Sequence, residues 1–401
     1  MLYAFYALAA LSILQGIFSL IEGIRFRAYV LKSLQTPRGS YTPRASIIAP
    51  CKGLDIALEE NLRALFGQDY PDYEIIFAVS SGDDAARPII DRLIAEHALP
   101  AARIVIASPS DERSEKVNNL VAGVEAARAD SEAFVFVDSD ARTNPDWLRD
   151  LVSGLEDPQV GAATGYRWCV PERGGFCSAL LSAWNGAVAT TLGPHSRNFA
   201  WGGSTAILKS TFERIDLRDR WQRALSDDYA LTRAVQQAGL RIKFAPRCLL
   251  PSREDARLRQ LLEFTTRQVT ITRVYRPNAW WAGLISHVLF ALTFFGGLAL
   301  ILFSAIGGAD TRLLTTMLAT IYLLGTVKGA LRLDGARAAL RPERREITRM
   351  WWVYCLLWPL VSILFLYNFI KSATTRRIRW RGVVYEMRSP TETIVIRSAP
   401  V

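Results

Sequence analysis

A long uncharged segment at the N-terminus constrains this chain more than any other feature. From Leu2 to Ile21 there is no charged side chain, and only Ser12, Gln15 and Ser19 interrupt the apolar run. About 20 apolar residues in a helix suffice to cross the roughly 30 Å hydrocarbon core of a bilayer. No basic stretch precedes the run and no small-residue cleavage site follows it, which argues against a cleaved signal peptide. The sequence therefore predicts a transmembrane helix over residues 1–24.

The C-terminal part contains further apolar segments, and we expect about three membrane helices within residues 277–371. The segments are Trp280–Ile306, Leu313–Leu331 and Trp351–Ile370. Paired tryptophans near the start of the first and the third are typical of the membrane interface. Composition agrees, because 50% of the 401 residues are hydrophobic, which is more than one ordinary soluble core requires.

Basic residues flank these segments and give the chain a net charge of +10. They lie in a linker at 25–44, in the stretch 332–349 and in a tail at 372–401. Anionic lipid head groups attract such clusters, so we expect the bilayer as partner and no nucleic acid. The linker and the stretch 332–349 place the middle domain in the cytoplasm by the positive-inside rule. A fourth crossing would put the basic tail outside, so either one C-terminal segment only dips into the membrane or the tail breaks the rule.

The five cysteines are widely spaced and form no CxxC pair, which fits a reducing compartment and argues against a disulfide framework or a structural zinc site. Together with the charge pattern, this predicts an integral protein of a bacterial inner membrane, with its soluble domain facing the cytoplasm.

The soluble middle, residues 45–276, alternates strand-like and helical patterns. Short β-rich runs occur at 45–51, 73–79, 103–107 and 134–138, and a helical pattern follows each of the first three. Such alternation predicts βαβ units and a Rossmann-like α/β domain, with a mainly parallel sheet covered on both faces. Ligands of such sheets bind beyond the carboxyl ends of the strands.

Polar residues gather at that predicted edge. Those that directly follow the strands are Lys52, Gly53, Asp83, Asp84, Asp138 and Asp140. Two carboxylates as close as Asp138 and Asp140 repel each other unless positive charge lies between them. Such pairs also occur as turn residues and helix caps, but carboxylate oxygens suit Mg²⁺ or Mn²⁺, which share the phosphates of a substrate. We therefore predict a metal site at Asp138 and Asp140, serving a nucleotide diphosphate.

Several motifs in order resemble a known family. The chain reads "IIAPCKGLD", "SSGDDAA", "EKVNNL", "VDSDAR", "SDDYAL" and, in the tail, "IRWRGVVYEM". This order is similar to the family 2 type of GT-A glycosyltransferases and, within them, to the ceramide glucosyltransferases. The resemblance covers the middle domain and the tail. It implies a GT-A fold and a metal-dependent, inverting transfer of a sugar from a UDP-sugar to a lipid hydroxyl, with Mg²⁺ or Mn²⁺ as cofactor.

The same resemblance implies roles for individual residues. Asp84 would contact the uridine, Asp138 and Asp140 would serve the diphosphate and the metal, and Asp228 would be the general base with Asp227 beside it. The two acids at 227 and 228 open a predicted helix, where negative charge favours the helix dipole and Asp227 could act as the cap. The residues alone therefore leave a structural role open.

Further residues are expected in the substrate site on weaker grounds. They are Pro50, Lys116, Asn119, Gly203 and His195. Lys116 and Asn119 open the helix after the third strand, where surface capping is the alternative to donor binding. Gly203 would let the backbone approach a sugar or permit a turn. A lone histidine such as His195 is more often structural.

One motif departs from the family pattern. Where the group has (Q/R)xxRW, this chain reads "RQVTI" at 267–271, with Thr270 and Ile271 in the positions of Arg and Trp. That motif helps to hold the acceptor and the diphosphate in processive relatives. We expect Arg267, Gln268 or Arg273 to take over this role.

The acceptor is expected to be a lipid, because each CH₂ moved from a bilayer to water costs about 0.8 kcal/mol. Ceramide is the first candidate, and a polyprenyl phosphate, a hopanoid or a growing polysaccharide are alternatives. A basic membrane-anchored lipid-binding protein is the alternative outside the enzymes, and it would need no acids clustered on a sheet edge. A transporter would need more polar groups in its membrane segments.

Overall fold

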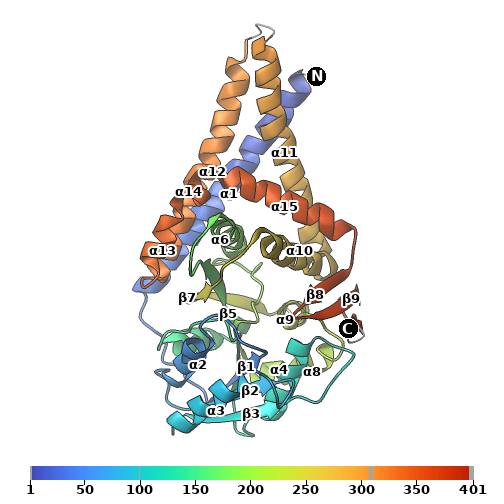
Figure 1. Cartoon of the computed structure of the whole chain (residues 1–401). Helices are drawn as coiled ribbons and strands as arrows, with labels where there is room; N and C mark the ends of the chain where they lie inside the picture. The colour runs from blue at the N-terminus through green and yellow to red at the C-terminus, as the bar shows by residue number, and fades with distance from the viewer. Residues whose placement is uncertain (1, 99, 307–309, 397–401) are drawn as a thin grey trace. The chain divides into compact units, whose positions relative to one another are not determined.

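The computed structural model describes residues 2–98, 100–306 and 310–396, and the chain divides into two compact units (Figure 1). The helical unit comprises Met1–Tyr29, Arg173–Thr191 and Asp255–Thr375. The sheet unit comprises Val30–Glu172, Leu192–Glu254 and Arg376–Val401. Each unit is therefore assembled from segments that are distant in the sequence.

The helical unit contains the long apolar helices that the sequence predicts. Helices α1 (Leu2–Gln35), α11 (Pro277–Ile306) and α12 (Arg312–Ala339) provide the three candidate membrane spans found among the described residues. Only 11% to 22% of the residues in their apolar windows are buried in the protein, so most of these side chains are free to face lipid. The N-terminal membrane helix and two of the C-terminal ones are confirmed as candidate spans.

The third predicted C-terminal segment does not form one long helix. It is divided into α14 (Trp351–Cys355) and α15 (Trp358–Ala373). The 16 residues of α15 would extend over about 24 Å, which is short of the roughly 30 Å hydrocarbon core. Pro359 lies in the first turn of α15, where its fixed φ and missing N–H suit a helix start and not a continuation. The expectation of about three C-terminal membrane helices is thus corrected to two among the described residues.

Polar side chains join the spanning helices to one another. Ser12 Oγ lies 2.8 Å from Thr293 Oγ1, and Gln15 Nε2 donates a hydrogen bond to Ser286 Oγ at 2.6 Å. Two of the polar residues that interrupt the first apolar run therefore have hydrogen-bond partners on α11, a kind of contact that stabilises the packing of membrane helices. The unit also contains α6 (Phe176–Ala189), α10 (Leu258–Tyr275) and α13 (Arg344–Arg349).

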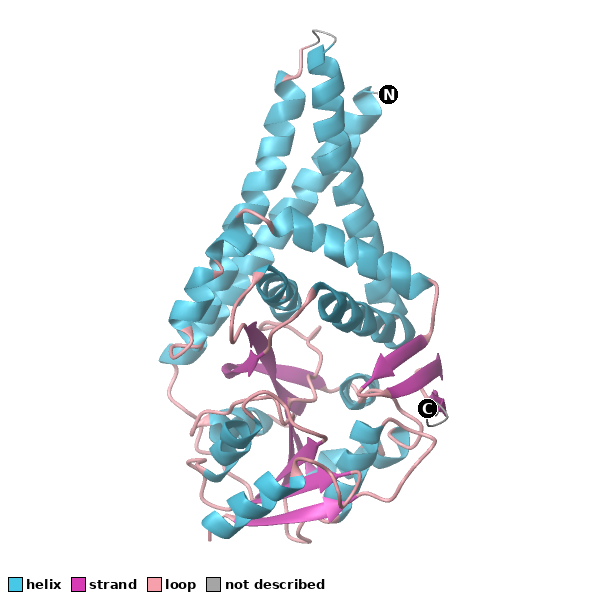
Figure 2. Ribbon diagram, in the orientation of Figure 1, coloured by secondary structure: helices cyan, strands magenta, loops and turns pink. Residues whose placement is uncertain are grey.

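A seven-stranded sheet forms the centre of the sheet unit within the described ranges, in the order β3-β2-β1-β4-β6-β5-β7 (Figure 2). Its strands are β1 (Ala45–Cys51), β2 (Tyr73–Val79), β3 (Ala101–Ile106), β4 (Ala133–Val137), β5 (Val160–Val170), β6 (Ser204–Leu208) and β7 (Arg241–Arg253). Strand β6 is antiparallel to both β4 and β5, and the other pairings are parallel. The predicted mainly parallel α/β fold is confirmed.

Every residue of β1, β2 and β4 is buried, so both faces of the central strands are covered. The helices of this unit are α2 (Leu58–Phe66), α3 (Arg87–Glu96), α4 (Glu115–Glu125), α5 (Trp147–Val152), α7 (Lys209–Arg214), α8 (Leu217–Arg220) and α9 (Asp227–Gln237). Phe136 of β4 packs edge-on against Trp221, with ring centroids 5.3 Å apart. Aromatic packing of this kind anchors the C-terminal half of the unit to the centre of the sheet.

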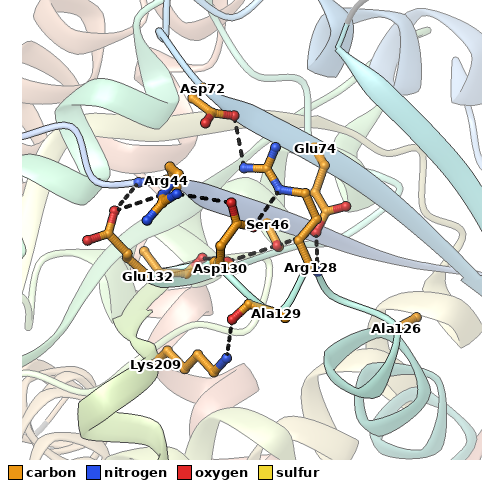
Figure 3. A network of polar contacts seen from close by, with 12 residues as sticks. Arg44, Ser46, Asp72, Glu74, Ala126, Arg128, Ala129, Asp130, Glu132 and Lys209 are labelled. Atoms are coloured by element: carbon orange, nitrogen blue, oxygen red, sulfur yellow. Dashed lines mark hydrogen bonds and ion pairs between the residues drawn. The ribbon is translucent and has the colours of Figure 1, made fainter.

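A network of hydrogen bonds and ion pairs lies at the edge of the sheet where β1 and β2 begin (Figure 3). Glu74 is fully buried and accepts hydrogen bonds from Ser46 Oγ at 2.5 Å and from the backbone N of Arg128 at 2.8 Å. Its carboxylate also pairs with Arg103, and Arg128 pairs with Asp72 at 2.8 Å. A buried acid with several donors is well satisfied, so this network stabilises the fold.

The C-terminal residues form a small antiparallel sheet that clusters with the sheet unit. Its strands are β8 (Arg377–Trp380), β9 (Val383–Ser389) and β10 (Glu392–Ile396), in the order β10-β9-β8. Tyr385 and Met387 of β9 are almost completely buried. The basic tail is therefore a folded part of the same unit that carries the predicted site.

Candidate active site

Lys116 joins two of the predicted acids at the carboxyl end of the sheet. Its Nζ lies 2.7 Å from Asp138 Oδ1, directly after β4, and 3.3 Å from Asp227 Oδ1, at the start of α9. Ser114 caps α4 by accepting a hydrogen bond from the backbone N of Val117 at 3.3 Å. The cap fixes the first helical turn, which carries Lys116.

Arg167 of β5 supplies a second fixed positive charge. Its Nη1 lies 3.3 Å from Asp140 Oδ2 and 3.0 Å from Glu254 Oε1, and its Nη2 lies 3.8 Å from Asp138 Oδ2. The guanidinium also lies over the ring of Trp201, 5.1 Å from its centroid. The sequence alone indicates neither Arg167 nor Glu254 as a site residue, because one arginine inside a strand and one glutamate after another strand form no motif.

Burial and local charge shift the pKa values of the acids in different directions. Burial tends to raise the pKa of Asp138, but Lys116 and Arg167 outweigh it and hold that pKa below 3.8. Burial raises the pKa of Asp140 to about 6, against the opposing charge of Arg167. Burial also raises the pKa of Asp227 to about 7, against the charge of Lys116. The site therefore holds more carboxylates than its two cations can neutralise.

One carboxylate oxygen of Asp140 is available to bind a further cation. Its Oδ1 is buried and has no hydrogen-bond partner among the described residues, whereas both oxygens of Asp138 face Lys116 or Arg167. The described residues contain no group of three or more His, Cys, Asp or Glu side chains arranged to hold a metal by themselves. Mg²⁺ and Mn²⁺ are commonly bound through one or two carboxylates and the phosphates of a substrate. The residues present fit such a shared site. Arg167 already relieves part of the predicted repulsion between the carboxylates of Asp138 and Asp140.

The two neighbouring acids of "SDDYAL" have different surroundings. Ser226 caps α9, which corrects the suggestion that Asp227 is the cap. Asp227 is 5% exposed, whereas Asp228 is half-buried. Asp228 Oδ1 accepts hydrogen bonds from Ser226 Oγ and, at 2.7 Å, from the backbone N of Tyr229. Asp228 is therefore the oriented and more accessible acid of the two.

Glycines before β6 make room for this cluster. A Cβ on Gly202 would lie 1.9 Å from Asp227 Oδ2 and 2.8 Å from Lys116 Nζ. A Cβ on Gly203 would lie 2.2 Å from the ring of Trp201. The predicted Gly203 thus makes room for an aromatic ring, and its neighbour Gly202 makes room for Asp227 and Lys116.

The loops after β1 and β2 are tied together at the predicted donor site. Asp84 Oδ1 accepts a hydrogen bond from the backbone N of Gly53 at 2.8 Å. Gly53 has φ +65°, which a residue with a side chain rarely adopts. Lys52 forms an ion pair with Glu115 at the start of α4, and Asp83 is exposed in the turn after β2. Asp84 therefore acts as a link between the two loops.

Other predicted residues lie around this core. Pro50 is buried within β1, and Asn119 Oδ1 accepts a hydrogen bond from Ser80 Oγ, just after β2, at 3.1 Å. His195 lies in the segment before β6, and its Nδ1 is buried without a hydrogen-bond partner among the described residues. The hydrogen bonds and ion pairs of the acid cluster described above do not include His195. Its role in substrate binding stays a prediction.

The residues around the altered motif lie on α10, in the helical unit. Arg267 lies over the ring of Phe264 at 5.2 Å, and Arg273 donates a hydrogen bond to the backbone O of Ser372 at 2.7 Å. Thr270 and Ile271, which replace the expected Arg and Trp, are both buried. A role of Arg267, Gln268 or Arg273 in acceptor binding stays a prediction.

Comparison with known proteins adds a family to this geometry. The family model described as "Glycosyl transferase family 21" matches residues 4–393. Ceramide glucosyltransferase 1 of Caenorhabditis elegans is 24% identical over 208 residues, which is 49% of this chain and 43% of the relative. Ceramide glucosyltransferase of Komagataella phaffii is 35% identical over 89 residues, which is 21% of this chain and 18% of the relative. The chain thus spans less than half the length of these curated relatives.

Among solved structures, the mannosyltransferase PcManGT from Pyrobaculum calidifontis, in complex with GDP-Man and Mn²⁺, aligns with a TM-score of 0.48 and 17% sequence identity. The alignment covers 91% of this chain and 99% of that chain.

Proposed function

Because the chain belongs to glycosyl transferase family 21, we propose that it transfers a sugar from a UDP-sugar to a hydroxyl group of a membrane lipid, with ceramide as the first candidate acceptor. The observation that carries the proposal is the cluster of Asp138, Asp140, Asp227 and Asp228 at the carboxyl end of the sheet. Asp138, Asp140 and Asp227 contact Lys116 or Arg167, and Asp228 follows Asp227 at the start of α9. The names of the curated relatives support the choice of acceptor.

Asp228 is suited to act as the general base. In an inverting transfer the acceptor hydroxyl attacks the anomeric carbon from the face opposite the diphosphate, and a base takes the hydroxyl proton. Ser226 and the backbone N of Tyr229 fix the orientation of Asp228 through its Oδ1. The new bond joins the lipid oxygen to the sugar, the bond to the diphosphate breaks, and UDP leaves.

Fixed positive charges are suited to hold the leaving diphosphate. Negative charge develops on the leaving oxygen, and preorganised cations stabilise it. Lys116 and Arg167 are held in place by their acidic partners before any substrate arrives. A divalent cation bound through Asp140, with Asp138 beside it, would supply further neutralisation of the diphosphate.

The candidate membrane helices support a lipid acceptor. A long-chain alcohol leaves the bilayer only at a cost of about 0.8 kcal/mol per CH₂, so the enzyme must meet it at the membrane. Helices α1, α11 and α12 are long and apolar enough to hold the chain there. A polyprenyl phosphate or a hopanoid would be met in the same way, and the assay below separates these acceptors.

The test is a transfer assay with the purified full-length chain in lipid nanodiscs. A panel of UDP-sugars is combined with ceramide, a hopanoid and a polyprenyl phosphate, with Mn²⁺ or with a chelator, and mass spectrometry identifies the product. We expect a hexosylated lipid only when the metal is present. Asp228→Asn should lower turnover at least about 100-fold while UDP binding stays unchanged. Asp219→Asn, at an exposed acid of α8, serves as the control. Lipid binding without any product would favour the non-catalytic lipid-binding protein.

A further inference from the structure

A strained turn in the C-terminal hairpin carries an arginine. The two residues between β8 and β9 are Arg381, with φ +45°, and Gly382, with φ +86°. Hairpin turns in which both residues have positive φ favour Asn-Gly, because Asn and Gly adopt this conformation readily. Arginine at the first position is strained. The turn itself thus gives no reason for an arginine at this position, and its side chain must be considered.

The side chain of Arg381 contacts the loop that leaves β1. Its guanidinium donates hydrogen bonds to the backbone O of Lys52 and, at 2.7 Å, to Asp55 Oδ1. The other oxygen, Asp55 Oδ2, accepts a hydrogen bond from Ser139 Oγ at 2.6 Å. Ser139 stands between Asp138 and Asp140. Hydrogen bonds therefore lead from the C-terminal turn through Asp55 to Ser139, the residue between the two acids.

A second contact attaches the same hairpin to the helix that carries Lys116. Tyr385 of β9 is 2% exposed, and its hydroxyl accepts a hydrogen bond from the backbone N of Glu115 at 3.3 Å. Glu115 is the first residue of α4, and its side chain pairs with Lys52. The hairpin thus contacts two segments that build the cluster, the loop after β1 and the start of α4.

We propose that Arg381 is a positioning residue of the donor site. It holds the loop Lys52–Asp55 and, through Asp55 and Ser139, orients the acid pair for a nucleoside diphosphate and its metal. The inference rests on the proposed function, since it takes this ligand to be the one that the acid pair binds. The C-terminal hairpin is then a working part of the donor site and not only a basic tail.

The experiment measures the binding of UDP with Mn²⁺ to the full-length protein by calorimetry, together with thermal unfolding. Arg381→Asn suits the turn, so the thermal midpoint should stay unchanged or rise, while the Kd for UDP should increase about tenfold or more, equivalent to about 1.4 kcal/mol. Arg381→Lys should weaken UDP binding less than Arg381→Asn does, because the lysine ammonium keeps the positive charge but lacks the paired donors of a guanidinium. Arg379→Ala, at an exposed position of the same hairpin, is the matched control and should change neither quantity.

A double variant tests the proposed route. If Arg381 acts through Asp55 and Ser139, Arg381→Asn should add little to the weakening of UDP binding already caused by Ser139→Ala. Wild-type Kd in Arg381→Asn would overturn the inference and leave the proposed function intact. A parallel loss of stability and binding in both Arg381 variants would show a merely structural role and overturn it too. Absence of UDP binding by the unaltered protein would instead overturn the proposed function, and the inference with it.

Discussion

Replacing Asp140 with asparagine tests the charge balance of the acid cluster. Burial raises the pKa of this carboxyl from its ordinary value of 3.8 to about 6. The folded state therefore favours the protonated carboxyl. Protonation of Asp140 stabilises the folded protein fully below about pH 4, and this stabilisation is lost as the pH rises through about 6. At about 1.4 kcal/mol per pKa unit, and with about two units between the two values, the ionised carboxyl costs the folded protein about 3 kcal/mol at pH 8. Asparagine cannot ionise and avoids this cost.

We therefore expect Asp140→Asn to unfold at a higher temperature than the wild type at pH 8, and at a similar temperature near pH 4. One kcal/mol moves the midpoint by about 2 to 4 °C for a domain of about 150 to 250 residues, so the gap at pH 8 should be about 6 to 12 °C at most. The assay is thermal unfolding of both proteins in the same detergent with a chelator, between pH 4 and 8. Added Mn²⁺ should raise the midpoint of the wild type and leave that of the variant unchanged.

Asp83→Asn makes the same chemical change at an exposed acid and serves as the control. A gap of equal size at every pH would show that ionisation of Asp140 is not its cause. A variant less stable than the wild type at pH 8 would refute the charge argument outright.

Two further substitutions probe the packing of the cluster and the opposite edge of the sheet. Gly202→Ala would place a methyl group 1.9 Å from Asp227 Oδ2, so we expect the Asp227–Lys116 pair to be displaced. The transfer rate should then fall at least about 100-fold, as it does when an active site loses an electrostatic group. A wild-type rate would show that the acids can move without consequence for transfer. Glu74→Ala removes the acceptor of Ser46 and of the Arg128 backbone, so chemical denaturation should show a loss of about 2 to 4 kcal/mol. The KM for the UDP-sugar should stay unchanged, and a raised KM without loss of stability would contradict the structural role.

The four parallel strands that come first in the sequence could be predicted because each is a compact apolar run followed by a turn. The last three strands of the sheet could not. Strand β5 is rich in glycine and alanine and contains Arg167, and β7 contains Pro246 and Pro251. Such residues have low β-propensity, so tertiary pairing decides their conformation. The interruption before α15 was missed for a related reason, since hydropathy does not register a helix break between apolar residues.

The acids of the site could be predicted from their positions at strand ends, but their partners could not. Asp138 and Asp140 follow a recognisable strand, and parallel topology brings such ends to one edge. Arg167 comes from β5, which the sequence did not reveal as a strand, and Arg381 comes from a tail whose motif "IRWRGVVYEM" indicates the family but no role for this arginine. Which cation meets which acid depends on pairings between distant segments, and those are set by the folded chain.

The interruption between α14 and α15 makes the number of candidate membrane crossings odd instead of even. The described residues contain three candidate spans, where four were expected. If all three candidate spans cross the membrane, the odd number of crossings places the start of α1 and the segment that follows α12 on opposite sides. The linker 25–44, the stretch 332–349 and the C-terminal hairpin would then share one side of the membrane, which agrees with the positive-inside rule. The hairpin can join the sheet unit without any of its basic residues being translocated.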